Sequence, residues 1–372
     1  MLVESTVIPV SRPNLGVAEA ANVAEVMAST QISSSGVFLD RFEEEFADFV
    51  GVRHGIATSS GTTALKLALV AHGITRGDEV VVPSLAFVAV ANAVFACGAT
   101  PVIADINRAS LTLCPVAFER AVTEQTKAVI PVHLYGVPAS MDLIRRVADR
   151  HGIIVVEDAA EAHGARYQGK CVGSLGDSAI FSFYGNKILT TGEGGMAMTN
   201  DDVLAARMRL LRGQGIDQSR PFWAVEPGFN FRMSNVAAAI GLAQIRRFDE
   251  ISAGFHRVAE QYRQALGGHP QIELISPPSS AISADWLFTI FLREPAVDRD
   301  SVMAALAAKG IETRPVFPPL HLMEAFGECG TSCPQAEQLA ARGLSLPTWS
   351  LMSEENVAGV VDALLLVLSE RV

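Results

Sequence analysis

Residues 180–196 read IFSFYGNKILTTGEGGM and contain a single lysine, Lys187. Short apolar segments surround Lys187, and a glycine-rich turn at 192–195 follows it. Glycines let a backbone approach a ligand closely or adopt a positive φ. A lysine held in a dry pocket has a destabilised ammonium group and can attack a carbonyl carbon to form a Schiff base. The pattern makes Lys187 a candidate nucleophile, and the plainer alternative is a solvated surface charge beside a common kind of turn.

A second stretch, residues 54–74, combines a short strand, a turn of small residues and a helix predicted over 62–71. This arrangement points free backbone N–H groups at an anion, and the hydroxyls of Ser60, Thr62 and Thr63 add donors. Simple capping of the helix by serine and threonine explains the pattern equally well. The stretch lacks the lysine–serine ending of a Walker-type phosphate loop.

A third stretch brings two carboxylates to the end of a buried strand. Residues 153–156 are all apolar, as in a parallel strand covered on both faces, and Glu157 and Asp158 follow them. Ligands of open α/β sheets bind outside the carboxyl ends of the strands. A carboxylate there could pair with the protonated pyridine nitrogen of pyridoxal phosphate (PLP) and keep its ring an electron sink. Capping of a helix by Asp158 is the alternative. Phe87, just past another strand end, either lies on a flat cofactor or packs in the core.

The remaining pattern alternates between helices and strands, which is typical of an α/β fold with a mainly parallel sheet. We expect helices at 14–30, 39–49, 86–96, 141–151 and 201–212 and a long helix from near 234, with strands at 80–82, 100–104 and 127–132. After about residue 250 the pattern changes to a helix at 256–266, a strand at 286–292 and helices at 301–309 and 354–368. We therefore predict a large domain over 1–249 and a small α/β domain over 250–372.

The composition limits the class of protein. The chain has 372 residues, 49% hydrophobic and 19% charged, which describes a compact folded protein of about two domains. The net charge of −11 argues against a nucleic-acid partner. The N-terminus lacks a basic start followed by an apolar run, so no signal peptide is predicted. Residues 80–106 are apolar but interrupted by prolines and polar residues, unlike a membrane helix.

The five cysteines are scattered and odd in number, which argues against a disulfide framework and favours the reducing cytoplasm. Cys329 and Cys333 form a short cluster with no second pair nearby, so we predict no metal site.

Six blocks, in this order, resemble the nucleotide-sugar aminotransferases of the DegT/DnrJ/EryC1/StrS family. They are SSGTTALKLAL, GDEVVVPSLAFVAVANAV, PVHLYG, VVEDAAEAHGA, FSFYGNKILTTGEGGM and FRMSNVAAAIGLAQ. The resemblance covers nearly the whole chain. It implies a PLP enzyme of fold type I, like aspartate aminotransferase, with a mainly parallel seven-stranded sheet in the large domain. GNKILTTGEGGM and IETRPVF are most similar to the GDP-perosamine synthase branch of the family.

The resemblance also implies a role for individual residues. Lys187 would be catalytic and carry PLP as a covalent Schiff base, and Asp158 would be the partner of the pyridine nitrogen. Phe87 would stack on the ring, and Glu161, at a position that is often Gln, would lie near the ring hydroxyl. The residues expected to hold the phosphate are Ser60, Gly61, Thr62, Ser182 and, from the neighbouring subunit of a homodimer, Asn235.

The substrate contacts implied by the resemblance are less regular. They are Ser33, Ser34 and Ser35 in the 31–36 loop, together with Arg314 and His321. The segment around Pro318 and Pro319 departs from the spacing usual in the family. Since the whole protein is acidic, arginines must offset the charge of a diphosphate. The candidates are Arg212, Arg232 and Arg314.

The implied reaction is a ping-pong transfer of an amino group from L-glutamate to a nucleotide-linked 4-keto-6-deoxy sugar. Conversion of GDP-4-keto-6-deoxy-D-mannose to GDP-perosamine is favoured, with a product destined for lipopolysaccharide O-antigen or another glycan. The intact Lys187 favours transamination, since relatives with His there are dehydratases.

Other functions remain open. One is an aminotransferase for another nucleotide sugar, dTDP- or UDP-linked and aminated at C3 or C4. Another is a PLP-binding regulator, against which the acidic charge and the lack of room for a DNA-binding domain both argue. A third is a structural α/β protein. The dimer could also pair into a tetramer.

Overall fold

The computed structural model describes residues 7–217, 219–220, 222–293, 298–327 and 332–370. The described residues form a seven-stranded sheet with the order β1-β9-β8-β5-β4-β2-β3. Its strands are β1 (His54–Thr58), β2 (Glu79–Pro83), β3 (Thr100–Ala104), β4 (Thr126–Val129), β5 (Ile154–Asp158), β8 (Ser178–Ser182) and β9 (Gly195–Thr199). The five strands from β8 to β3 run parallel, and β9 is antiparallel to both of its neighbours. The mainly parallel seven-stranded sheet predicted from the sequence is confirmed.

Helices cover this sheet because its strands are apolar on both faces. β8 and β9 are buried along their whole length. α3 packs against β8 and β9, and α6 packs against β5. The helices of this part of the chain are α1 (Val17–Ser29), α2 (Val37–Val50), α3 (Gly61–Ala71), α4 (Ala89–Ala96), α5 (Pro115–Ala121), α6 (Met141–His151), α7 (Asp202–Arg212) and α8 (Asn235–Arg246).

A second, antiparallel sheet has the order β10-β12-β14-β13. Its strands are β10 (Ile272–Leu274), β12 (Phe288–Leu292), β13 (Arg314–Pro315) and β14 (Gly343–Leu346). The helices of this region are α9 (Phe248–Leu266), α10 (Arg299–Ala308), α11 (Pro334–Arg342) and α12 (Glu354–Ser369). Side chains from this sheet and from α9, α10 and α12 form a hydrophobic cluster of their own. The remaining short elements are β6 (Arg166–Tyr167), β7 (Lys170–Cys171), β11 (Ala281–Ile282), η1 (Leu134–Gly136) and η2 (Leu320–Leu322).

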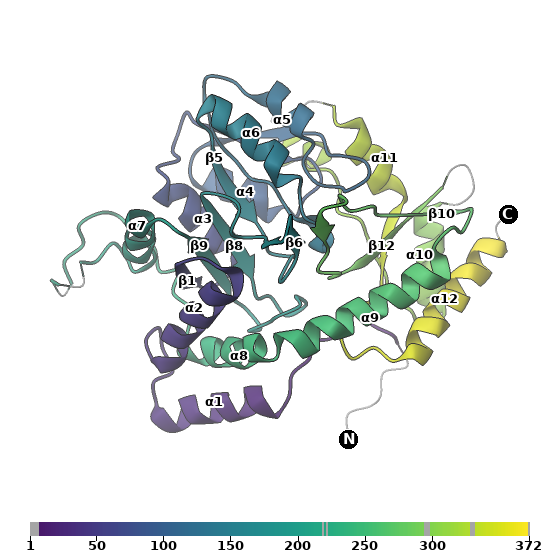
Figure 1. Ribbon diagram of the computed structural model, residues 1–372, viewed down its shortest axis with the longest axis horizontal. Helices are drawn as coiled ribbons and strands as arrows, with labels where there is room; N and C mark the ends of the chain where they lie inside the picture. The colour runs from purple at the N-terminus through teal and green to yellow at the C-terminus, as the bar shows by residue number, and fades with distance from the viewer. Residues whose placement is uncertain (1–6, 218, 221, 294–297, 328–331, 371–372) are drawn as a thin grey trace.

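The long helix α9 links the two sheets. Figure 1 shows it running from the end of α8 to the second sheet, where it lies beside α12. The long helix expected from residue 234 therefore ends at Arg246, and the helix expected at 256–266 begins earlier, at Phe248. Arg247, which lies between them, leaves the helical backbone, and its guanidinium binds Glu19. The predicted domain boundary at 249/250 falls inside α9, so that division stays a prediction.

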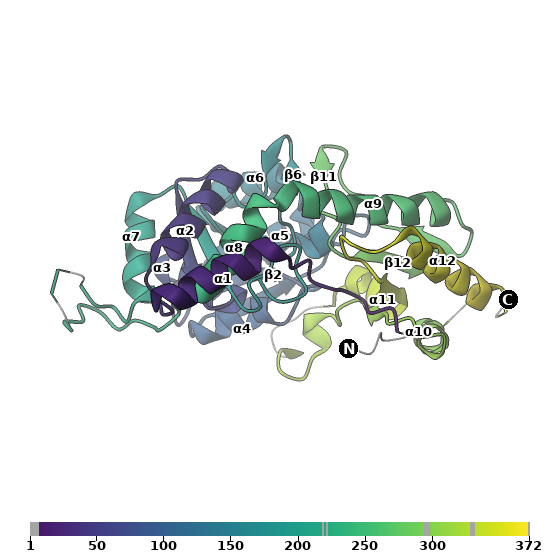
Figure 2. The ribbon, with the colours of Figure 1, turned by 90° about the horizontal axis from the view of Figure 1, so that it is seen from below.

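The segment between α7 and α8 leaves the body of the molecule. Its described residues project away as an arm in both views (Figures 1 and 2). Within this segment Phe222 is almost fully exposed, and Trp223, next to it in the sequence, is more than half exposed. In the described part of the chain, no helix combines the length and apolar character needed to cross a membrane.

Candidate active site

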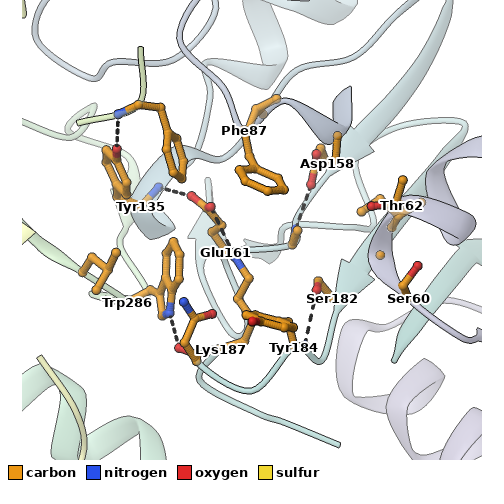
Figure 3. A pocket seen from close by; sticks show the side chains of 18 of the residues that line it. Ser60, Thr62, Phe87, Tyr135, Asp158, Glu161, Ser182, Tyr184, Lys187 and Trp286 are labelled. Carbon is orange, nitrogen blue, oxygen red and sulfur yellow. Dashed lines mark hydrogen bonds and ion pairs between the residues drawn. The ribbon is translucent and has the colours of Figure 1, made fainter. Parts of the chain in front are cut away.

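A cavity of about 520 Å³ opens at the carboxyl ends of β5 and β8. Parallel strands end at one edge of a sheet. Asp158, which ends β5, pairs in register with Ile180 of β8, and Ser182 ends β8 two residues further on; both side chains line the cavity. The opposite wall comes from residues close to β12 and β13. Nine residues predicted from the sequence line the cavity: Ser60, Gly61, Thr62, Phe87, Asp158, Glu161, Ser182, Lys187 and Arg314 (Figure 3).

The N-terminus of α3 forms one end of the cavity. Ser60 is its N-cap, and its Oγ accepts a hydrogen bond from Thr63 N at 3.2 Å. The N–H groups of Gly61 and Thr62 have no acceptor within the helix, as expected of a first helical turn. A Cβ on Gly61 would lie 2.8 Å from Ser182 Cβ, so glycine lets the helix end approach β8. Free N–H groups beside the hydroxyls of Thr62 and Ser182 make a site for an anion.

Asp158 is a buried carboxylate in the wall of the cavity. Its Oδ1 accepts a hydrogen bond from Ala160 N at 3.0 Å. Burial, with a smaller contribution from the nearby charge of Glu161, raises the pKa of Asp158 to about 6, against the opposing effect of Lys187. A cation held against this carboxylate would relieve the cost of burying its charge. The position therefore suits a partner for a protonated ring nitrogen.

The turn after β8 presents Lys187. Lys187 N donates to Tyr184 O at 2.9 Å, and Tyr184 pairs with Gly192 in an isolated bridge. Gly192 has a φ of +82°, and a Cβ on Gly194 would lie 2.3 Å from Thr191 Oγ1. The glycine-rich pattern seen in the sequence is therefore required by the fold of this turn. It returns the chain to β9 and leaves Lys187 at the cavity.

The Lys187 amine lies between a carboxylate and an indole ring (Figure 3). Its Nζ is 3.2 Å from Glu161 Oε1 and 3.7 Å from the centroid of the Trp286 ring. The other oxygen of Glu161 accepts a hydrogen bond from Tyr135 N at 2.9 Å. The Lys187 side chain is 11% exposed. The alternative of a solvated surface lysine is therefore wrong.

Phe87 is 54% exposed and lines the cavity between β2 and α4. Its ring lies 5.7 Å from that of Phe317, between ring centroids. The alternative that placed Phe87 in the core is wrong, and its face is available to a flat ligand.

Several residues of the cavity carry no role in the sequence-based prediction, among them Tyr135, Tyr184 and Trp286. Tyr135 is buried and has a φ of +53°, which is unusual for a residue other than glycine. Its hydroxyl accepts a hydrogen bond from Phe317 N. The block PVHLYG pointed to the neighbourhood of Tyr135 but not to its contacts. Trp286 stands at the start of a predicted strand, where no local signal marks it.

Several predicted residues lie elsewhere. Asn235 does not line the cavity, because its Nδ2 donates to Gln31 O at 2.8 Å and its Oδ1 accepts from Leu39 N at 3.1 Å. The 33–35 serines lie near Asn235, whose backbone N donates to Ser33 O. Roles for these residues at the site of a neighbouring subunit stay predictions. Both ring nitrogens of His321 are bonded, to Ser84 Oγ and Glu337 Oε1, and His321 is not among the residues lining the cavity.

The three arginine candidates also separate. Arg314 lines the cavity and is about half exposed. Arg212 is held in the fold instead, because it binds Glu43 and donates to Ala57 O at 2.8 Å. Arg232 Nε donates to Asn230 Oδ1 at 3.0 Å, and Arg232 does not line the cavity. Arg314 is thus the arginine of the three placed to meet a ligand.

Among the described residues, no cluster of three or more His, Cys, Asp or Glu side chains could hold a metal ion. Cys329, one half of the predicted cysteine cluster, lies outside the described residues.

Comparisons with known proteins agree with this geometry. GDP-perosamine synthase of Caulobacter vibrioides is 50% identical over 362 residues, which cover 96% of this chain and 97% of that protein. The structure of DesI in the presence of its TDP-sugar product has a TM-score of 0.92 at 35% identity, covering 98% of this chain and 94% of that one. Spr1654 from Streptococcus pneumoniae, in its PLP form, has a TM-score of 0.94 at 26% identity, covering 98% and 100%. The family model that matches residues 13–365 completes the assignment: the chain belongs to the DegT/DnrJ/EryC1/StrS aminotransferase family.

Proposed function

We propose that this enzyme is a PLP-dependent aminotransferase that moves the amino group of L-glutamate to a nucleotide-linked 4-keto-6-deoxy sugar, and that GDP-perosamine is its product. The observation that carries the proposal is a buried lysine, Lys187, in a cavity that also presents an anion site and the buried carboxylate of Asp158. The 50% identity with a GDP-perosamine synthase supports the choice of sugar.

The residues of the cavity fit PLP. The N–H groups at the start of α3, with Thr62 and Ser182, would hold the phosphate. Asp158 would pair with the ring nitrogen, and Phe87 would lie against the ring. Glu161 would lie near the ring hydroxyl, and Lys187 would bind the cofactor covalently through Nζ. When bound, PLP supplies the electron sink that makes a carbon next to nitrogen acidic.

The chain's own residues supply the rest of the chemistry. Nζ of Lys187, when it carries no other group, takes a proton from a substrate carbon and returns it as base and then acid. Glu161 orients this amine, because both of its oxygens are engaged at fixed positions. Burial of Asp158 keeps its pairing with a cation strong, since water screens it little. Arg314 offsets diphosphate charge at a site on an acidic protein.

The proposal includes a homodimer with shared active sites. Asn235 and the 33–35 serines lie together outside the cavity of their own chain, so any contact of theirs with a cofactor or substrate would be at the site of a second copy. The exposed aromatic side chains of the arm, Phe222 and Trp223, are suited to burial against a partner.

A second candidate function is the same amino-group transfer to a keto-sugar that is linked to a different nucleotide. The likeness to DesI, whose structure holds a TDP-sugar product, favours testing dTDP-linked keto-sugars beside GDP-linked ones. The GDP-linked substrate is preferred because the similarity to the Caulobacter vibrioides enzyme is higher.

The proposal is tested first by absorption spectroscopy of the purified protein. We expect a band from the lysine-bound cofactor that bleaches when L-glutamate is added and returns with GDP-4-keto-6-deoxy-D-mannose. Borohydride reduction followed by peptide mapping should place the cofactor on Lys187. Lys187→Ala should lose the band, whereas Lys170→Ala, a change at an exposed lysine, should keep it. A normal band and half-reaction in Lys187→Ala would refute the assignment, and return of the band with only dTDP- or UDP-linked sugars would refute the GDP specificity.

A further inference from the structure

One indole ring contacts both the side chain of Lys187 and the peptide that precedes it. The Trp286 ring lies 3.7 Å from Lys187 Nζ, measured to the ring centroid. The Nε1 of the same ring donates a hydrogen bond to Asn186 O at 2.7 Å. The orientation of the ring is thus fixed by the main chain next to the lysine whose amine lies over its face.

Trp286 reaches this position from another part of the fold. It stands two residues before β12, in the second sheet, whereas Lys187 follows β8 of the first. The indole is 3% exposed, and it also lies over Tyr135, at 6.3 Å between ring centroids. A buried ring held by one hydrogen bond and by packing has little freedom to turn.

We propose that Trp286 is a positioning residue for Lys187, and that its indole face and the Glu161 carboxylate together hold the free lysine ammonium at one location in the cavity. The proposal rests on the proposed function, in which this amine is the group that attaches the cofactor and moves the proton. The proposal explains why a buried tryptophan lies at this point, where the cavity borders the second sheet.

The physical reason for the proposal is that a lysine side chain is flexible and does not by itself hold its amine at one position. Its four-carbon stem allows many rotamers, and productive proton transfer requires one of them. Glu161 attracts the ammonium but would accept it from several directions. A cation prefers the face of an aromatic ring, and tryptophan offers the strongest such face. The two contacts together define both a distance and a direction for Nζ.

Other charged and titratable groups surround this amine and enter any test that varies pH. Asp158 and His163 interact electrostatically with Lys187. Glu193, Tyr184 and Arg314 line the same cavity. These groups remain in place when Trp286 alone is changed, so a comparison of Trp286 variants isolates the ring.

The direct test measures the amine without turnover. The full-length chain freed of cofactor is acetylated with acetic anhydride over a range of pH, and the labelling rate of Lys187 is read by mass spectrometry of its peptide. Without the ring the ammonium loses stabilisation, so in Trp286→Leu we expect the half-maximal labelling pH to fall by about one unit, a tenfold change. Trp286→Phe keeps a ring face but loses the hydrogen bond to Asn186 O, so its midpoint should lie between those of wild type and Trp286→Leu.

The pH profile of labelling distinguishes a change in the stability of the ammonium from a change in the accessibility of the amine to the reagent. A role in positioning moves the midpoint of the profile, whereas a wider opening of the cavity raises only its plateau rate. An unchanged midpoint in Trp286→Leu, in protein whose circular dichroism and melting temperature match those of Trp286→Phe, would overturn the proposal.

The second test uses the holoenzyme. A misplaced amine slows proton transfer but leaves the binding of L-glutamate intact, so Trp286→Leu should lower kcat about tenfold with KM nearly unchanged. Trp286→Phe, which keeps a ring face but not the hydrogen bond to Asn186 O, should restore part of the rate. A raised KM with an unchanged kcat would instead make Trp286 a substrate contact. Borohydride trapping on Lys187 in each variant keeps this result distinct from a failure of the proposed function itself.

Discussion

Nζ of Lys187 lies 3.2 Å from Oε1 of Glu161, and both side chains are almost completely buried. A buried ion pair is weak evidence for stability, but removal of one partner leaves the other charge without compensation. The second oxygen of Glu161 binds Tyr135 N, so the carboxylate joins Lys187 to a loop that also contacts the segment around Phe317.

Glu161→Gln separates the ion pair with Lys187 from the hydrogen bond with Tyr135 N. The amide keeps an acceptor for Tyr135 N but removes the charge facing Lys187. We expect the free energy of unfolding of the chain without cofactor to fall by about 3 kcal/mol near neutral pH. Urea unfolding checks this, with Glu193→Gln as the control, because Glu193 lines the same cavity but is exposed. Equal stability in the two variants would contradict the importance of the pair.

Asp158→Asn should stabilise the chain without cofactor, in a manner that depends on pH. Burial raises the pKa of Asp158 to about 6 from an ordinary value near 4. The folded state therefore binds a proton there more tightly than the unfolded state does, and the wild type loses stability as pH rises from about 4 to about 6. Asparagine does not titrate, so the variant should gain about 3 kcal/mol over wild type above pH 6 and nothing near pH 4.

Denaturant titrations of both proteins at pH 4.5 and 8 measure this difference. A variant that is less stable than wild type at the higher pH would show that burial does not control the titration of Asp158. The same variant should bind PLP more weakly, because the ring nitrogen loses its charged partner.

The sequence revealed the parts of the site that depend on local pattern. Ser60, Gly61 and Thr62 follow one predicted strand, and Asp158 ends another. These two signals are local, and the parallel sheet brings the strand ends together without further information. Ser182 was named only through the resemblance to the family. The fold class followed from the same alternation of helices and strands.

The contacts of Trp286 could not be found this way. The ring meets Lys187 only because the second sheet is placed against the first, and no pattern within either segment encodes that placement. The arginines show the same limit. In the sequence, Arg212 and Arg314 are both candidates for binding the diphosphate. Only the tertiary structure shows that Arg212 forms an ion pair with Glu43. The junction of α8 and α9, where Arg247 leaves the helical backbone, was missed because residues 242–253 contain no Gly or Pro to mark the end of a helix.

His163 should make the protein sensitive to acid in the opposite sense to Asp158. Its ring packs among Phe46, Phe181 and Phe183, and burial, helped by the charge of Lys187, lowers its pKa to about 3. The unfolded chain takes up a proton near pH 6.5 while the folded chain does not, so stability falls as pH drops below that value.

In His163→Phe this loss is absent. Between pH 7 and pH 5 the wild type should lose about 2 kcal/mol more than the variant. His151→Ala, at an exposed position at the end of α6, should behave as wild type. Equal losses in wild type and His163→Phe would mean that the buried ring accepts a proton in the folded state.

Gly61→Ala tests the approach of α3 to β8. The new Cβ would lie 2.8 Å from Ser182 Cβ, so the helix end or the strand must move. We expect about a tenfold loss of PLP affinity, since the N–H groups that meet the phosphate would shift with the helix. Gly359→Ala is the matched control, because its Cβ would meet nothing within 4 Å in the middle of α12 and should raise stability slightly. Unchanged affinity in Gly61→Ala would remove α3 from the phosphate site.

Arg212→Gln and Arg314→Gln should affect different properties. Arg212 is mostly buried against Glu43, so its loss leaves this carboxylate with Arg209 as its cationic partner and with the N–H of Ala57. We expect a loss of about 2 kcal/mol in the free energy of unfolding and no change in the KM for the nucleotide sugar. Arg314 is about half exposed at the cavity, so its loss should alter stability by less than about 0.5 kcal/mol but raise that KM about tenfold.

Steady-state kinetics and urea unfolding of both variants decide between these roles. Arg314→Lys is an informative third variant, because it keeps the positive charge but loses the planar fork that binds two phosphate oxygens at once. A KM midway between those of wild type and Arg314→Gln would indicate that both charge and geometry contribute. A raised KM in Arg212→Gln and a normal KM in Arg314→Gln would reverse the assignment and place the diphosphate at the C-terminal end of α7.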